Sequence, residues 1–192
     1  MHPKENDIAL WEAFLSGDQE AFGTLFKNNY RHLFQYGSKI SRNIPLLEDS
    51  IQELFMEIWK NRNGVPTISV KAYLLKALKY KLLRELSKNN ATDYRDEIAE
   101  DGVFELGHEA FLIAKQEDEE KTQKVVNSLQ QLSNRQKEII YLKFYQNLSY
   151  DEVSSIMNIN YQAARNLLYQ AIKALKKIMI MVSGLQLAMS CW

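Results

Sequence analysis

The sequence predicts an all-α protein made of two small helical domains joined by an acidic linker. Glycine and proline are scarce, with seven and three residues among 192, whereas Leu, Ile, Lys and Glu are frequent. Several segments repeat apolar residues every three or four positions, and no alternation of apolar and polar residues is long enough to propose a sheet. Charge then divides the chain, because a basic segment, residues 60–88, is followed by an acidic one, residues 91–121.

The first two helices are predicted by apolar spacing and by their boundaries. Residues 8–15 form a short amphipathic pattern that ends before Asp18. Asp18 can cap the next helix, whose apolar residues recur over positions 21–34. We expect residues 41–45 to end that helix, because Pro45 cannot continue an established helix. The third helix is therefore expected to begin at Leu46.

Residues 46–60 predict an amphipathic helix with a partly acidic outer face. Such a face is usually only solvated. Alternatively, Met56 and Trp59 beside charged groups suit a protein-binding patch. A carboxylate metal cluster is disfavoured, because no Glu-x-x-His pair accompanies the acids at 49, 53 and 57. The candidate protein-binding residues are Asp49, Gln52, Glu53 and Met56.

A loop over residues 61–67 leads into the most basic helix, residues 69–88. From residue 60 to residue 88 there are eight basic residues and one acid, a net charge of +7. Leucines form the expected packing side, and tyrosines alternate with cations on the opposite side. Exposed tyrosines between cations suit unstacked bases, although a solvated basic face would show the same pattern. The candidate residues are Arg62 in the loop and Tyr73, Lys76, Tyr80 and Arg84 in the helix.

The acidic segment reverses the sign of the charge. Residues 91–121 hold eleven acids and three bases, a net charge of −8, with a few apolar residues such as Phe104. These features predict a linker that is ordered only where its apolar residues find a surface. The predicted domains are residues 1–88 and 122–182, separated by a linker at 89–121 and followed by a tail at 183–192.

The second domain contains the pattern of a helix-turn-helix. Ser133 with Gln136, and Ser149 with Glu152, have the spacing of the capping box that begins a helix. Residues 158–160 are too polar to continue a helix, and Asn160 can cap the next one. A short helix, a tight turn and a long helix are expected in that order.

The long helix has one packing side and one polar side. Ala164, Leu168, Ala171 and Leu175 share the packing side, and no acid occurs between residues 161 and 177. An α-helix fits the DNA major groove, where Arg can pair with guanine and Asn or Gln with adenine. A solvated helix of a bundle would share some of these features, but the two capping boxes and the turn favour nucleic-acid binding. The candidate DNA-binding residues are Gln162, Arg165, Asn166, Tyr169 and Lys173.

Other classes of site find little support in the sequence. Cys191 is the only cysteine, which excludes a disulfide framework, and the three histidines lack metal-ligand spacing. We therefore expect no metal, no cofactor, no small-molecule substrate and no catalytic residue. The N-terminus has no apolar core of signal-peptide length, and residues 178–192 are too short and too mixed for a membrane span. A cytoplasmic protein is expected.

With these pieces in order, the chain resembles a bacterial sigma factor of the extracytoplasmic-function (ECF) type, a branch of the sigma-70 family. The resemblance covers about residues 10–177, and four motifs in the family's order carry it. They are Gly17-Asp18-Gln19-Glu20-Ala21-Phe22, the segment from Glu48 to Trp59, Ala72-Tyr73-Leu74, and the segment from Leu132 to Leu175.

The resemblance implies a role for each candidate surface. Asp49, Gln52, Glu53 and Met56 would dock on the β′ clamp helices of core RNA polymerase, and the second domain on the β flap. The loop from residue 61 and the basic helix would capture the unwound promoter −10 strand. The long helix would read the −35 element, and the acidic linker would enter the polymerase cleft. The resemblance also implies an anti-sigma factor, which could hold the protein at the inner membrane.

Some positions depart from the family pattern. Tyr80 and Arg84 stand where many members have Asn and Asp, and Tyr73 stands where Trp is frequent. In the long helix, residues 163–167 replace a common Thr-Val-Lys-Ser-Arg pattern. The promoter sequence therefore cannot be transferred from the family.

Two alternative functions remain at the level of sequence. One is a helix-turn-helix transcriptional regulator that binds duplex DNA without core polymerase. The other is a nuclease that uses the carboxylates near Asp49, which the lack of paired metal-ligand motifs disfavours.

Overall fold

The structure, a computed structural model, describes residues 3–62, 69–89, 104–106 and 127–189. Within these ranges every regular element is helical, which confirms the predicted all-α class. The chain divides into two compact units, Met1–Gly102 and Val103–Trp192. Each unit is described separately below.

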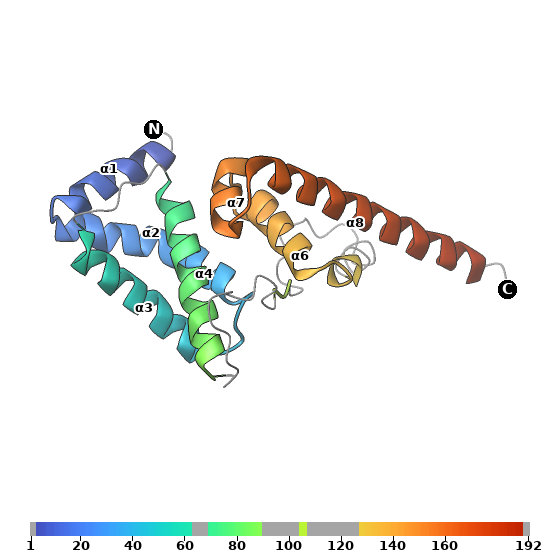
Figure 1. Cartoon of the computed structure of the whole chain (residues 1–192), viewed down its shortest axis with the longest axis horizontal. Coiled ribbons are helices and arrows are strands. Elements are labelled where there is room, and N and C mark those ends of the chain that lie inside the picture. Colours follow the sequence, from blue (N-terminus) through green and yellow to red (C-terminus); the bar gives the residue numbers. More distant parts are fainter. Residues whose placement is uncertain (1–2, 63–68, 90–103, 107–126, 190–192) are drawn as a thin grey trace. The chain divides into compact units, whose positions relative to one another are not determined.

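Four helices make the first unit: α1 (Pro3–Leu15), α2 (Gln19–Gly37), α3 (Ile44–Lys60) and α4 (Val70–Asn89). Helices α2, α3 and α4 pack against one another, and α1 packs against α2 and more lightly against α4 (Figure 1). The core between them is mainly leucine and isoleucine, with Leu25, Leu33, Leu47, Ile51, Leu74, Leu75, Leu78 and Leu82 almost fully buried. A row of aromatic rings from α1, α2 and α3 completes it, including Trp11, Phe14, Phe22, Trp59, Phe55 and Phe26.

The helix starts of this unit follow from short polar side chains. Asp18 Oδ1 accepts hydrogen bonds from the backbone N–H groups of Glu20 and Ala21 at 2.8 and 3.1 Å, which confirms the predicted cap of α2. Asn43 Oδ1 accepts from Leu46 N at 3.1 Å and caps α3. These bonds satisfy backbone donors that have no partner inside a helix.

The expected boundary at Pro45 was wrong. Helix α2 already ends at Gly37, and α3 begins at Ile44 with Pro45 in its first turn. The missing N–H of proline costs nothing in the first turn, because that group would have had no partner within the helix. Pro45 therefore helps to begin a helix here.

The second unit holds α6 (Asn134–Ile140), the π-helical turn η3 (Tyr141–Tyr145), α7 (Tyr150–Met157) and α8 (Tyr161–Met189), preceded by a helical turn at residues 127–130. Helices α6 and α7 both pack against α8 (Figure 1). Both predicted capping boxes are present. Ser133 and Gln136 exchange hydrogen bonds of 3.1 and 3.3 Å, and Ser149 and Glu152 exchange bonds of 2.6 and 3.2 Å.

The π-helical turn η3 was not predicted, and it creates a small aromatic cluster. The rings of Tyr141 and Tyr145 stack with centroids 5.3 Å apart. Gln146 Nε2 donates a hydrogen bond of 3.0 Å to the Tyr141 hydroxyl. Burial raises the pKa of Tyr141 to about 12. The turn η3, which carries this cluster, follows directly after α6 and leads toward α7.

Part of the predicted linker belongs to the second unit. Phe104 and Leu106 are only 3% and 5% exposed, and the Phe104 ring lies edge-on to Tyr141 with centroids 5.7 Å apart. The apolar surface on which Phe104 packs therefore includes the ring of Tyr141. At the other end, α8 continues to Met189, so the tail boundary predicted at residue 183 falls inside a helix. Phe111 and Leu112, also expected to anchor the linker, lie outside the described residues.

Candidate nucleic-acid and protein interfaces

Helices α7 and α8 and the turn between them have the predicted helix-turn-helix order. Helix α7 ends at Asn158, whose backbone is left-handed with φ 52° and ψ 45°. Asparagine tolerates this conformation better than most residues, so the chain can reverse within three residues. Asn160 Oδ1 then accepts a hydrogen bond of 2.7 Å from Ala163 N and caps α8, as predicted. Ile159 lies half-buried between the two helices.

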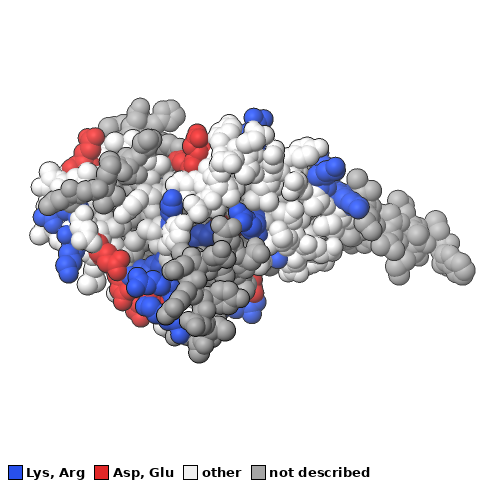
Figure 2. Space-filling view, in the orientation of Figure 1, with Lys and Arg blue, Asp and Glu red and all other residues white. Residues whose placement is uncertain are grey.

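The two sides of α8 separate as the spacing predicted. Ala164, Leu168 and Ala171 are buried, and Leu175 is half-buried. On the visible face of the molecule, basic side chains occur along the described part of α8 (Figure 2). The predicted DNA-binding residues Gln162, Arg165, Asn166, Tyr169 and Lys173 are all exposed.

Two of these side chains contact each other. Gln162 Nε2 donates a hydrogen bond of 3.3 Å to Asn166 Oδ1, one helical turn away. Tyr169 is 67% exposed despite its large ring. An exposed amide pair, an arginine and an aromatic ring are groups that read base edges and contact the DNA backbone.

An aromatic contact at the start of α8 was not predicted from the sequence. Tyr161 is 45% exposed and lies edge-on to Tyr150 of α7, with ring centroids 5.6 Å apart. Lys143 Nζ lies 4.4 Å from the centre of the Tyr150 ring and donates to Leu148 O. The tyrosine pair holds the start of α8 against α7, and Lys143 holds η3 against the start of α7. A tyrosine at the start of each of the two helices was the sequence feature that could have predicted this contact.

The candidate protein-binding residues share one exposed face of α3. Asp49, Gln52, Glu53 and Met56 are all exposed, and Met56 reaches 68%. Their neighbours Ile51, Leu54, Phe55 and Ile58 are buried on the opposite side. An exposed methionine bordered by acids and an amide is a suitable surface for a protein partner.

The residues predicted for unpaired DNA have more varied surroundings. Arg84 is exposed, and Lys76 and Tyr80 are half-buried. Tyr73 is less exposed than expected, because its ring contacts Trp11 of α1 with centroids 5.5 Å apart, and burial raises its pKa. Only part of the Tyr73 ring can therefore stack on a base.

Arg62 lies at the end of the described chain before residue 69. Its guanidinium carbon is 4.8 Å from the centre of the Trp59 ring, and its Nη1 donates a hydrogen bond of 3.0 Å to Trp59 O. The arginine is thus held at the C-terminal end of α3. The loop that follows, residues 63–68, lies outside the described residues.

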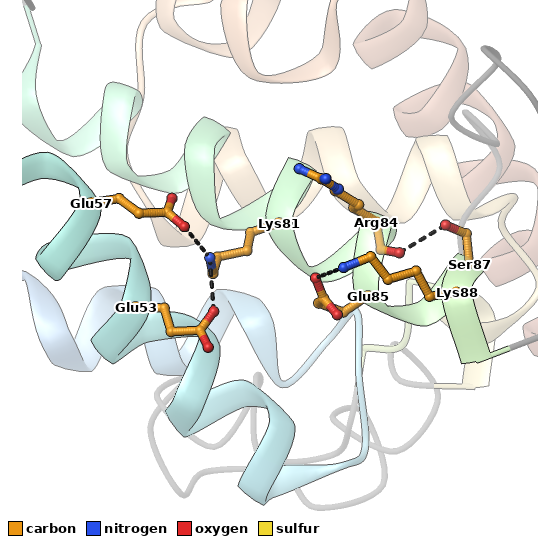
Figure 3. A network of polar contacts seen from close by, with 7 residues as sticks. All are labelled: Glu53, Glu57, Lys81, Arg84, Glu85, Ser87 and Lys88. Atoms are coloured by element: carbon orange, nitrogen blue, oxygen red, sulfur yellow. Dashed lines mark hydrogen bonds and ion pairs between the residues drawn. The ribbon is translucent and has the colours of Figure 1, made fainter. Parts of the chain in front are cut away.

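Not all of the positive charge in the basic segment is available to DNA. Lys81 Nζ lies 2.7 Å from Glu57 Oε1 and 2.9 Å from Glu53 Oε2, and Lys88 Nζ lies 2.7 Å from Glu85 Oε1 (Figure 3). The hydrogen bond that Lys88 donates, together with the positive charge of Lys88, lowers the pKa of Glu85. Figure 2 also shows basic and acidic side chains next to each other on the first unit. The sequence count of +7 already includes Glu85 but not Glu53 and Glu57, so it overstates the charge directed at a nucleic acid.

The described residues include neither a metal site nor a membrane-spanning helix. Among those residues, no group of three or more His, Cys, Asp and Glu side chains is arranged to hold a metal ion. Two acids of the metal cluster that the sequence disfavoured, Glu53 and Glu57, instead contact Lys81. None of the described helices is both long enough and apolar enough to cross a membrane.

Comparison with known proteins relates the chain to a family of transcription proteins. Residues 122–175 match the family model described as sigma-70, region 4, and this range contains α6, α7 and the first half of α8. The "ECF RNA polymerase sigma factor SigK" of Mycobacterium ulcerans (strain Agy99) is 21% identical over 170 residues, which are 88% of this chain and 90% of the relative. The chain is therefore similar to ECF-type sigma factors over most of its length, and its residues 122–175 match sigma-70 region 4.

A second relative with the same name extends the comparison. The SigK of Mycobacterium bovis (strain BCG / Pasteur 1173P2) is 23% identical to this chain over 178 residues, 88% of this chain and 90% of the relative. Both alignments cover nearly the full length of each protein. The likeness therefore includes the first unit, beyond the region 4 match.

Two solved structures share the fold of this chain. CnrH, solved in complex with the cytosolic domain of CnrY, has a TM-score of 0.61 and 18% identity, and the alignment covers 92% of this chain and 98% of CnrH. The sigma factor RpoE from Bartonella quintana, solved with the anti-sigma factor NepR, has a TM-score of 0.56 and 17% identity, with 82% and 96% covered. The all-helical architecture is therefore shared across almost all of each chain.

Proposed function

We propose that this chain is a sigma factor, which binds core RNA polymerase and directs it to promoters by contacting two DNA elements. Helix α8 would read the −35 element, and α4 with the segment that precedes it would bind the −10 strand. The observation that carries this proposal is the exposed, acid-free side of α8 within the region 4 match. The chain acts as a binding subunit in this proposal, and no reaction step is assigned to its side chains.

The proposal for the −35 element follows from the groups on α8. Arg165 offers a planar set of donors for guanine, while Gln162 and Asn166 carry the amides that pair with adenine. Lys173 lies two to three turns further along, where it can reach a phosphate. Base contacts near the start of the helix and backbone contacts near its middle are typical of a recognition helix.

The proposal for the −10 element uses the first unit. Arg84 provides an exposed cation, and Tyr80 and part of the Tyr73 ring provide flat surfaces for unstacked bases. Lys76 lies one turn from both tyrosines, where it can follow the strand backbone. Arg62, held against Trp59, would contact the same strand from the end of α3.

Polymerase binding is assigned to both units. The exposed face of α3 with Asp49, Gln52, Glu53 and Met56 would dock on the β′ clamp helices, and the second unit would dock on the β flap. The acidic segment between the units would enter the polymerase cleft, where negative charge can follow a path that accommodates RNA. Most of that segment lies outside the described residues.

An anti-sigma partner is part of the same proposal. CnrH and the Bartonella RpoE were both solved in complexes, one with the cytosolic domain of CnrY and one with the anti-sigma factor NepR. Because the chain shares the fold of both proteins, we propose that an anti-sigma factor restrains this chain until transcription is required. The restrained and active forms would both be cytoplasmic, with the inner membrane as a holding site if the partner is anchored there.

The test is reconstitution with core RNA polymerase on a library of promoter fragments. We expect run-off transcripts from a subset of templates that share two spaced elements, and none from core enzyme alone. A chain that stimulates no template would contradict the proposal. A footprint on promoter DNA by the chain alone, unchanged when core enzyme is added, would favour the alternative of a regulator that acts without polymerase.

A further inference from the structure

Lys81 of α4 lies between two carboxylates of α3. Its Nζ is 2.9 Å from Glu53 Oε2 and 2.7 Å from Glu57 Oε1. Figure 3 shows the ammonium group between the two acids, which stand one turn apart on the neighbouring helix. Lys81 was counted in the net charge of the basic segment, and its contacts join two helices.

The surroundings of Lys81 keep it charged and in place. Its side chain is 14% exposed, whereas those of Glu53 and Glu57 are 60% and 61% exposed. Burial by itself would lower the pKa of Lys81, but the hydrogen bonds and charges of Glu57 and Glu53 outweigh burial, and its pKa is raised. The lysine is therefore protonated at neutral pH and can donate to both acids at once.

Glu53 connects this contact to the proposed docking surface. It lies on the exposed face of α3 with Asp49, Gln52 and Met56, whereas Lys81 is mostly covered. An isolated glutamate on a helix surface samples several rotamers, and binding must then restrict it to one. Contact between Oε2 and Lys81 restricts Glu53 before any partner arrives, which reduces the entropy lost on docking.

We propose that Lys81 is a positioning residue for polymerase binding. By holding the Glu53 carboxylate in one orientation, it raises the affinity of the α3 surface for core RNA polymerase without touching the polymerase itself. This inference rests on the docking role proposed above for Glu53. It also gives α4 a second role, because the helix that carries the −10 candidates then also orders the docking surface.

The first test compares substitutions at Lys81 in the full-length chain. Lys81→Met keeps an apolar stem but removes the charge, and we expect it to weaken binding to core polymerase about fivefold. Lys81→Arg keeps the charge and can donate to both acids, so its affinity should stay within about twofold of the wild type. Lys88→Met is the matched control, because it removes the same charge from the same helix, and the ion pair of Lys88 is with Glu85 of α4 itself.

The second test is a double-mutant cycle with Glu53→Gln, measured as core-polymerase affinity with thermal unfolding alongside. If Lys81 acts through Glu53, Lys81→Met should cause little further loss in the Glu53→Gln background. Wild-type affinity in Lys81→Met, or an equal loss in both backgrounds, would overturn the inference. Failure of the wild-type chain to bind core polymerase would instead overturn the proposed function itself.

Discussion

Lys81 and Arg84 are three residues apart on α4, yet their surroundings give them different roles. Lys81 contacts two acids of α3, whereas Arg84 is exposed. The same contrast appears around Trp59, where Arg62 lies on the ring, and around Trp11, which covers part of Tyr73. Residue type alone does not distinguish a cation that binds DNA from one that joins two helices.

Arg165 is the residue whose substitution most directly tests the −35 assignment. It is exposed in the first half of α8, and a bidentate pair with guanine contributes on the order of 1–3 kcal/mol. We expect Arg165→Ala to lower transcription from −35-dependent promoters about tenfold while leaving core-polymerase affinity unchanged. Run-off transcription and a core-binding assay measure the two effects separately.

Arg31→Ala provides the matched control for this prediction. Arg31 is exposed on α2, outside every candidate surface, and its substitution removes the same charge from the chain. Transcription with Arg31→Ala should resemble the wild type. Equal losses of transcription and polymerase affinity in Arg165→Ala would show that the residue does not act through the promoter.

At the scale of the helices, the close approach of α2, α3 and α4 depends on a glycine at the end of α2. A Cβ atom on Gly37 would clash with Leu47 Cδ1 and would lie 3.3 Å from Leu82 Cδ1 and 3.4 Å from Leu78 Cδ2. Leu47, Leu78 and Leu82 are fully buried and have little room to move. Only glycine therefore fits where the three helices meet.

Gly37→Ala should accordingly destabilise the first unit by about 1–3 kcal/mol, the usual cost of overpacking a core. Gly23 in the same helix is the control, because a Cβ atom there would meet no atom within 4 Å. Gly23→Ala should be neutral or stabilise by up to about 1 kcal/mol, since alanine favours a helix over glycine. Chemical denaturation measures both changes, and equal stabilities of the two variants would contradict the packing argument.

At the scale of the whole molecule, a formal net charge of zero conceals strong local charge. The described bases are concentrated on α4 and on the outer side of α8, whereas most acids of residues 91–121 lie outside the described ranges. A neutral total is suitable for a protein that binds DNA only as part of a larger assembly, because its unaided attraction to phosphates remains weak.

The limits of the second unit can be tested with two fragments. Phe104 and Leu106 are buried in this unit, although the sequence assigned them to the linker. A fragment of residues 103–192 should therefore be more stable than one of residues 122–192, by roughly 2 kcal/mol for the lost apolar burial. Thermal unfolding followed by circular dichroism makes the comparison. Equal midpoints would show that Phe104 and Leu106 add nothing to this unit.

The sequence by itself determined the helical class, the two capping boxes and the division of α8 into a packing side and an exposed side. These features depend on neighbours within one or two helical turns, so their physical causes are visible in the order of residues. The exposure of Gln162, Arg165, Asn166, Tyr169 and Lys173 follows from the same local periodicity.

Only the tertiary structure decided which charged and apolar groups meet across helices. Lys81 contacts acids that are 24 and 28 positions earlier in the chain, and Phe104 packs on a tyrosine 37 positions later. Pro45 also lies in the first turn of α3, although the sequence placed it just before that helix. Asn43 caps α3 two residues before Pro45. Such contacts arise from packing between distant segments, and a periodic pattern within one segment carries no information about its partner.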